Sequence, residues 1–287
     1  MQYEIGRTSR LGNRKTNQDR LSSIETEDGV MLVLGDGLGG TKGGEIAAQT
    51  LVDTINNEME RHPLPVLHPE SFLEALILQA HYAIQEVGQA QQPPIEPGTT
   101  AVLCLVQQGV VWWAHCGDSR CYLFRNGLPL YRTKDDSYVE HLYQQGELTM
   151  ETLDGHPMRN LVTQCIGPPK ISPNVSVSKG LPLAKDDILL LCSDGFWEPL
   201  DDAQIGALIK KGVLNESLNT LAERAEHASY PKSDNTSALA MKITSLQLIK
   251  KDPNDDIKIH TRNETNLSGA IDEIERALEE YSDEMKE

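Results

Sequence analysis

The stretch that most constrains the fold runs from Gly29 to Glu45, GVMLVLGDGLGGTKGGE. A short apolar run closed by glycines is typical of a buried strand that stops at a tight loop. The loop carries one carboxylate, Asp36, at the end of this strand. Glycines on both sides allow positive φ and a close approach of the main chain to a bound group. The combination predicts a cation held by carboxylate and backbone oxygens.

Two phosphate-binding interpretations compete for the same residues. Gly35, Gly37 and Gly40 satisfy the G-x-G-x-x-G spacing of a dinucleotide-binding turn. Asp36 opposes that function, because a carboxylate repels a pyrophosphate unless a metal ion lies between them. A P-loop is excluded because Gly40 is not followed by Lys-Ser or Lys-Thr. From this stretch alone, a strand-to-helix turn without any ligand remains an alternative.

The net charge of the chain limits which classes of molecule can bind it. The chain of 287 residues has 43 acidic and 26 basic side chains, which gives a formal net charge of −17. Such a surface repels nucleic acid and anionic membranes and favours cations as ligands. No run of 18 apolar residues is present, and the first ten residues lack the apolar core of a signal peptide. We therefore expect a cytoplasmic protein without nucleic-acid or membrane partners.

Cysteine usage agrees with a reducing compartment. The five cysteines are Cys104, Cys116, Cys121, Cys165 and Cys192. They are odd in number, lie mostly in apolar runs and form no C-x-x-C pair. We expect small buried side chains rather than disulfides or zinc ligands.

Periodicity predicts a chain of mixed α and β structure. The expected helices cover residues 45–59, 71–87, 201–210 and 215–230, and the expected edge and final strands cover 1–10 and 237–244. After Thr99, three strand-like runs predict an antiparallel meander, and Asn126-Gly127 predicts a hairpin turn. This pattern opposes a dinucleotide-binding oxidoreductase, whose strands alternate with helices. Residues 134–165 interrupt the strands and are interpreted as an inserted surface segment.

Five aspartates share one context, because each lies at a strand end beside Gly, Asn or Ser. They are Asp19, Asp36, Asp118, Asp194 and Asp234. Residues 186–195, DDILLLCSDG, repeat the strand-Asp-Gly arrangement of the opening stretch, so two carboxylates are expected to meet at one edge of a sandwich. Two divalent cations about 3.5 to 4 Å apart need several such carboxylates. Without an accompanying His pair or Cys set, Mg²⁺ or Mn²⁺ is favoured over Zn²⁺.

Taken singly, these residues have ordinary explanations. Arg14 fits a solvated charge in the polar loop that precedes Asp19. Each aspartate fits a turn or capping residue, and Gly-Asp-Ser around Asp118 is good turn composition. The case for a site therefore depends on the whole set.

Nine pieces of the chain, in order, resemble the metal-dependent protein phosphatases of the PP2C (PPM) family in their compact bacterial form. They are GNRKTNQDR, LGDGLGG, GTTAV, AHCGDSRCYLFRNG, KDDS, HPMRN, IG, DDILLLCSDG and SDNTSALAM, and they lie within residues 3–243. Each piece is weak alone, whereas the ordered set is specific. The resemblance implies an α+β fold, an α-β-β-α sandwich of two antiparallel sheets between outer helices. The phosphatase domain would cover residues 1–245, with 134–165 as a flap-like insert.

Residues 246–287 are expected to lie outside that domain. Residues 246–266 are polar and aperiodic, which predicts a linker. Residues 267–287 place apolar side chains on one helical face and acids elsewhere, which predicts an acidic amphipathic C-terminal helix.

The resemblance also implies a set of metal ligands. Asp36 would bridge two ions, Mg²⁺ or Mn²⁺, with the backbone carbonyl of Gly37 on the second ion. Asp194 and Asp234 would complete the ligands of the first ion, directly or through water.

Three further roles follow from the same resemblance. Asp118 would hold a third, weaker ion beside the inserted segment. Asp19 would orient metal-bound waters without binding an ion directly. Arg14 would bind the substrate phosphate with its planar guanidinium.

The implied activity is hydrolysis of phosphoserine and phosphothreonine in proteins. A hydroxide bridging the metal ions would attack phosphorus without a phosphoenzyme, so neither Ser119 nor a cysteine is needed as nucleophile. The implied partners are phosphorylated proteins, namely a bacterial Ser/Thr kinase and its targets, and a monomer is expected. The alternative is a catalytically weak or silent phosphatase-like module that binds phosphoproteins. The presence of all five aspartates and Arg14 opposes that alternative.

Two departures from the family pattern affect proton handling. Gln18 stands where many relatives have Glu, which removes one negative group near the metal-bound waters. Leu38 and Thr41 stand where animal and many bacterial members, respectively, have His. A histidine general acid is therefore absent at both positions. Metal-bound water or a residue of the inserted segment such as His156 would then protonate the leaving group.

Overall fold

The computed structural model describes residues 1–246 except 39–42, 150–151, 153–155, 160 and 171. Contacts divide the chain into two units, Met1–Gln247 and Leu248–Glu287. The first unit holds every described helix and strand, and none of those helices is long and apolar enough to cross a membrane. Thr41 and the predicted C-terminal helix lie outside the described residues.

Two antiparallel β-sheets form the centre of the first unit. The five-stranded sheet has the order β1-β11-β10-β6-β7. Its strands are β1 (Gln2–Arg10), β6 (Arg120–Arg125), β7 (Leu128–Arg132), β10 (Ile188–Cys192) and β11 (Thr236–Ser245). The six-stranded sheet has the order β2-β3-β4-β5-β8, and β9 also pairs with β5. Its strands are β2 (Asp19–Glu25), β3 (Gly29–Asp36), β4 (Ala101–Gln107), β5 (Val110–Cys116), β8 (Ser176–Val177) and β9 (Leu181–Pro182).

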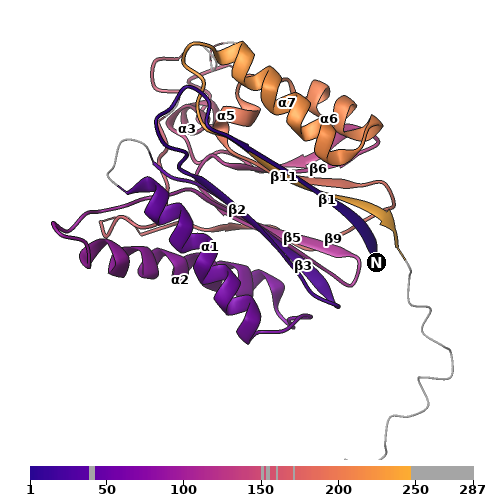
Figure 1. Cartoon of the computed structure of the whole chain (residues 1–287), viewed down its shortest axis with the longest axis horizontal. Helices are drawn as coiled ribbons and strands as arrows, with labels where there is room; N and C mark the ends of the chain where they lie inside the picture. The colour runs from indigo at the N-terminus through magenta and orange to yellow at the C-terminus, as the bar shows by residue number, and fades with distance from the viewer. Residues whose placement is uncertain (39–42, 150–151, 153–155, 160, 171, 247–287) are drawn as a thin grey trace, which may run out of the picture. The chain divides into compact units, whose positions relative to one another are not determined.

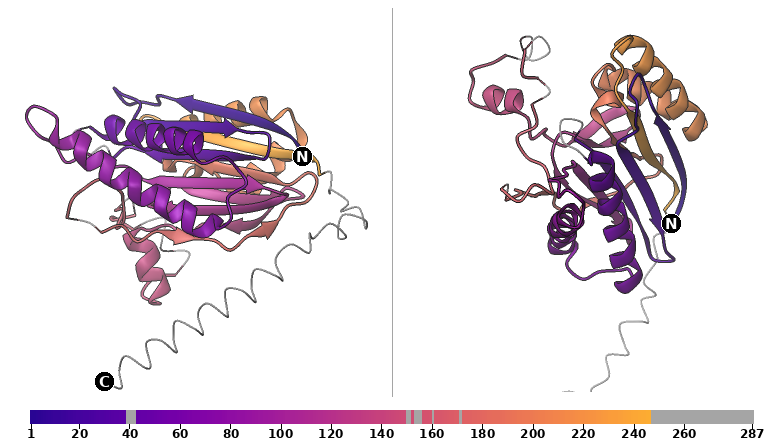
Figure 2. Two further views of the ribbon diagram at one scale, coloured as in Figure 1. Left: turned by 90° about the horizontal axis from the view of Figure 1, so that it is seen from below. Right: turned by 60° about the vertical axis from the view of Figure 1, so that its left-hand side comes forward.

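Helices cover the outer faces of both sheets. The helices are α1 (Gly44–Arg61), α2 (Pro69–Gln89), α3 (Tyr138–Gln144), α5 (Asp194–Trp197), α6 (Asp202–Lys211) and α7 (Leu214–Ser229). Figure 1 shows α1 and α2 on the six-stranded sheet and α6 and α7 on the five-stranded sheet. In Figure 2, α3 stands off the sheets on the chain between β7 and β8. The predicted α-β-β-α sandwich is confirmed.

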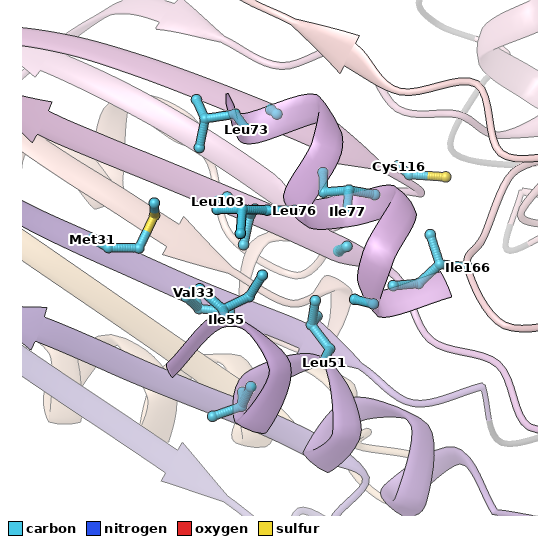
Figure 3. Packing of buried hydrophobic residues seen from close by; sticks show 14 of the residues in the cluster. Met31, Val33, Leu51, Ile55, Leu73, Leu76, Ile77, Leu103, Cys116 and Ile166 are labelled. Carbon is cyan, nitrogen blue, oxygen red and sulfur yellow. The ribbon is translucent and has the colours of Figure 1, made fainter. Parts of the chain in front are cut away.

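Strand β3 shows how one apolar run serves two cores. Alternate side chains of a strand point to opposite faces, and a sheet covered on both faces therefore needs apolar residues at every position. Met31 and Val33 pack under α1 and α2 (Figure 3), whereas Val30, Leu32 and Leu34 pack between the sheets. All five side chains are fully buried. A slip by one residue would exchange the two sets, so the register of β3 is fixed.

The expected three-stranded meander after Thr99 is wrong in one respect. β4 and β5 pair as predicted, but β6 belongs to the other sheet, where it pairs with β7 and β10. Gly117 in the turn between β5 and β6 has a φ of 115°, a conformation open to glycine that lets the chain leave the first sheet. Asn126 and Gly127 do form the predicted hairpin turn, with φ values of 56° and 78°. Both sheets are antiparallel, so the exclusion of a dinucleotide-binding fold still holds.

Candidate metal centre

Strand register places two of the predicted site residues opposite each other. Asp19 begins β2, Asp36 ends β3, and the two are direct cross-strand partners. The backbone of Asp36 is held from the next strand. Its N–H donates to Thr100 Oγ1 (2.9 Å), and its carbonyl accepts from Thr99 Oγ1 (2.9 Å) and Thr100 N (2.8 Å). Like charges directly opposite each other destabilise a sheet, so this pair needs compensation.

The five-stranded sheet delivers two more carboxylates to the same end of the sandwich. Asp194 begins α5 two residues after β10 ends, and Asp234 lies two residues before β11 begins. Gly195 permits this meeting, because a Cβ atom there would collide with the carbonyl oxygen of Asn235. The two strand ends can therefore approach only with glycine at this position.

All five predicted aspartates lie close enough to interact. The carboxyl of Asp36 is affected by the charges of Asp19, Asp194, Asp118 and Asp234. Asp118, in the turn after β5, is 6% exposed, and its charge is the first of the neighbouring carboxylates that raise the pKa of Asp194. The fold thus brings together residues that are up to 215 positions apart, from Asp19 to Asp234. Their function as ligands stays a prediction.

Burial and mutual repulsion raise the pKa values of four of these carboxyl groups. Burial is the largest cause that raises the pKa of Asp19 to about 6 and that of Asp118 to about 7. The pKa values of Asp36 and Asp194 are raised well above the ordinary value, first by burial and then by neighbouring carboxylates.

A closed ring of hydrogen bonds fixes Asp19 between the two sheets. Asp19 N donates to Asn17 Oδ1 (3.0 Å), and Asn17 Nδ2 donates to Ser9 Oγ (2.9 Å). Ser9 Oγ and Ser237 Oγ are 2.9 Å apart, and Ser237 N donates to Ser193 Oγ (3.0 Å). Ser193 Oγ closes the ring by donating to Asp19 Oδ2 (2.8 Å). Sequence reasoning missed Ser193, whose only signal is a hydroxyl in an apolar strand immediately before Asp194.

The donors at this end suit hard divalent cations. Asp19 Oδ1 and Asp194 Oδ1 are buried and have no hydrogen-bond partner, which is costly unless a cation or water satisfies them. Carboxylate oxygens are the ligands that Mg²⁺ and Mn²⁺ prefer. Within the described part of the chain, no three His, Cys, Asp or Glu side chains already converge as a finished ligand cluster. The residue types and the two unpartnered oxygens fit a divalent cation.

Arg14 lies at the edge of the carboxylate cluster. Its loop is tied to the start of β11, because Gln18 N donates to Asn235 Oδ1 (2.8 Å) and Asn235 Nδ2 donates to the carbonyl of Leu11 (2.8 Å). The Arg14 guanidinium pairs with Asp234 Oδ2 at 2.5 Å, and the arginine side chain is 51% exposed. A half-exposed guanidinium at this place can reach an incoming anion.

One departure from the family pattern, Gln18, has a structural counterpart. Gln18 Nε2 donates to Glu45 Oε2 (3.3 Å), so α1 supplies a carboxylate beside the residue that replaces the usual Glu. The sequence alone did not indicate Glu45 as a neighbour.

His156 packs beside the ring of Tyr138 at 6.2 Å and accepts from Met158 N (3.2 Å), both within the inserted segment. Its role as a proton donor stays a prediction.

Comparison with known proteins decides the family. Residues 7–240 match the family model described as protein phosphatase 2C. The chain belongs to this family. A serine/threonine phosphatase stp of Listeria innocua is 28% identical over 246 residues, which cover 84% of this chain and 96% of the relative. The PstP phosphatase of Mycobacterium tuberculosis is 31% identical over 206 residues, which cover 70% of this chain but 38% of that protein.

Solved structures agree with the family and the fold. A crystal structure of a bacterial serine phosphatase superimposes with a TM-score of 0.76 at 29% identity, covering 86% of this chain and all of that one. The catalytic domain of PstP, in complex with two manganese ions, gives a TM-score of 0.70 at 26% identity, covering 85% of this chain and 99% of that one. The chain is accordingly a serine/threonine protein phosphatase of the protein phosphatase 2C family.

The raised pKa values predict how the phosphatase responds to pH without divalent cations. A buried carboxyl group with a raised pKa keeps its proton in the folded state at pH values where the unfolded state has lost it. Stability in EDTA should therefore fall as the pH rises from about 4 to about 7. Asp36→Asn removes one buried charge, so this variant should melt at a higher temperature than the wild type in EDTA at pH 7.5.

Thermal unfolding by circular dichroism at pH 5.5 and 7.5 measures this effect. The matched control is Asp28→Asn, because Asp28 is exposed at the opposite end of the β2–β3 hairpin. The control should melt like the wild type at both values of pH. If Asp36→Asn were less stable than the wild type at pH 7.5 in EDTA, the carboxylates would not repel one another as described.

Proposed function

We propose that this phosphatase hydrolyses phosphoserine and phosphothreonine in proteins with Mg²⁺ or Mn²⁺ bound at the candidate centre. Asp36, Asp194, Asp234 and the Gly37 carbonyl would hold two cations. The observation that carries the proposal is that five aspartates interact at one end of the sandwich, where Asp19 and Asp194 each have one buried carboxylate oxygen without a hydrogen-bond partner. The manganese in the PstP structure supports a divalent cation of this class.

Phosphate-monoester hydrolysis is among the slowest reactions in water, and the phosphoryl group repels any anionic nucleophile. When bound, two divalent cations would neutralise that charge and supply a nucleophile at neutral pH. The protein's own residues then hold the geometry. Thr99 and Thr100 fix the backbone of Asp36, and the ring through Ser193 fixes Asp19 beside it.

Arg14 would bind the phosphate of the substrate. The net charge of −17 repels a phosphoprotein, so the site needs local positive charge besides the cations. Arg14 is the residue whose guanidinium touches the carboxylate cluster from the exposed side, through Asp234. A guanidinium donates two parallel hydrogen bonds to a phosphate, which a lysine cannot do.

The remaining assignments extend this proposal. Asp118 would hold a third, weaker cation, and residues 134–165 would act as a flap beside it. A recess of about 840 Å³ supports this arrangement, because Asp118 and the inserted helix α3 line its walls together. The enzyme would act as a cytoplasmic monomer on a Ser/Thr kinase and its targets. The cysteines of the described chain are all free and buried, which suits a reducing compartment.

Phosphate release from a phosphothreonine peptide tests the metal dependence. We expect turnover with Mn²⁺, none after EDTA, and a loss of at least about a hundredfold in Asp36→Asn, because that variant lacks the proposed bridging ligand. Asp28→Asn should keep wild-type activity. Turnover that persists in EDTA, or that is unchanged in Asp36→Asn, contradicts a metal-dependent reaction at this centre.

Arg14→Ala tests the proposed phosphate ligand. A hydrogen bond between two charged groups is worth about 1.5–3 kcal/mol, so kcat/KM should fall about ten- to a hundredfold. Lys15→Ala is the matched control, because it removes the same charge from the next residue of the same exposed loop. Equal losses in the two variants would mean that only the general positive field of the loop matters.

A further inference from the structure

The turn that carries Asp118 is hydrogen-bonded to the start of the inserted segment. Gly117 N donates to Asp136 Oδ2 (2.9 Å), and Asp136 N donates back to the carbonyl of Gly117 (3.0 Å). On the preceding strand, His115 Nε2 bonds to the carbonyl of Lys134 at 2.8 Å. The turn that carries Asp118 is therefore tied to the base of the inserted segment as well as to its own strand.

A second element reaches the same turn from the opposite side. The four-residue helix α5 begins with Asp194 and ends with Trp197. The indole Nε1 of Trp197 donates to the backbone carbonyl of Asp118 (3.0 Å). The helix α5 thus begins with one proposed ligand, Asp194, and its last residue, Trp197, donates a hydrogen bond to the backbone of another, Asp118.

Arg120 fixes Trp197 in that position. Its guanidinium carbon lies 3.2 Å from the centroid of the Trp197 ring, which is a close cation–π contact. The same guanidinium donates to both oxygens of Asp135 (2.8 and 2.7 Å) and to the hydroxyl of Tyr122 (3.0 Å). Arg120 is only 9% exposed, so these contacts are largely shielded from water. The indole of Trp197 therefore packs on the Arg120 guanidinium, and Asp135 of the inserted segment holds that guanidinium in place.

The recess of about 840 Å³ opens onto this contact. Asp118, Arg120, Asp135 and Trp197 all line it, together with side chains of α3. The indole bond is therefore at the boundary between the carboxylate centre and the space beside the inserted segment.

We propose that Trp197 is a positioning residue that sets the spacing between the Asp118 and Asp194 carboxylates and thereby the affinity of the cation held at Asp118. The inference rests on the proposed function, because it takes these carboxylates as cation ligands. The new element is the role of the indole N–H, which positions the backbone of Asp118, while Arg120 holds the indole in place. The indole N–H bonds the backbone of Asp118 and not that of Asp194, so losing the bond moves Asp118 and leaves Asp36, Asp194 and Asp234 in place for the two tighter cations.

The test is a Mn²⁺ binding isotherm on the full chain, followed by the electron paramagnetic resonance signal of free Mn²⁺. Trp197→Phe keeps an aromatic ring over Arg120 but loses the N–H donor. We expect the weakest class of bound Mn²⁺ to lose affinity about three- to tenfold, the range that one hydrogen bond accounts for, while the tighter class is unchanged. The unchanged tight class also shows that the variant is folded.

Two further variants sharpen the test. Trp112→Phe makes the same substitution on β5, where Trp112 packs against Gly180 away from Asp118, and its isotherm should match that of the wild type. Arg120→Lys keeps the charge but loses the fork to Asp135, and it should weaken the same class of site as Trp197→Phe does.

The outcomes separate this inference from the proposed function. If Trp197→Phe and the wild type give superimposable isotherms with Mn²⁺ bound, the role of Trp197 is wrong and the proposed function stands. A loss of both classes of bound Mn²⁺ in Trp197→Phe also overturns the assignment, because the effect would not be confined to Asp118. If the wild type binds no Mn²⁺, the proposed function and the inference fail together.

Discussion

The mutual repulsion of carboxyl groups at one end of the sandwich is the constraint on which the rest of the structure depends. Asp19 and Asp36 are cross-strand partners on β2 and β3. Asp194 follows β10 of the other sheet, and Asp118 lies in the turn between β5 and β6 that connects the two sheets. The apolar packing beneath the helices and between the sheets keeps the strands that deliver them in register. Repulsion among these carboxylates lowers the stability of the folded chain, and bound cations would restore it.

Polar contacts across the sheets determine how this charge is arranged. The ring through Ser193 joins β1, β10 and β11 of one sheet to Asp19 of the other. Glu45 approaches Gln18 from α1, so a negative group remains beside this position although the side chain at 18 is neutral. Arg14 closes the exposed side of the cluster through Asp234. These contacts link the loop that carries Arg14, both sheets and one helix in a single polar network.

The sequence predicted the parts that have local signals. Periodicity and turn residues predicted the buried strand that ends at Asp36, the buried strand just before Asp194 and the hairpin at Asn126-Gly127. They also predicted the helices α1, α2, α6 and α7. The crossing of β6 into the second sheet was not predicted, because strand pairing across Gly117 depends on the whole sandwich. Ser193 and Trp197 escaped notice for the same reason. The indole of Trp197 bonds a backbone carbonyl 79 residues earlier, and no periodic pattern records such a contact.

Anomalous diffraction at the manganese edge, from crystals grown with Mn²⁺, tests the proposed centre most directly. The five aspartates predict two strong peaks, one within ligand distance of Asp36, Asp194 and Asp234 and its neighbour bound by Asp36 and the Gly37 carbonyl. A third, weaker peak is expected beside Asp118. Strong peaks elsewhere on the acidic surface, with none touching Asp36, would contradict a metal centre at the end of the sandwich.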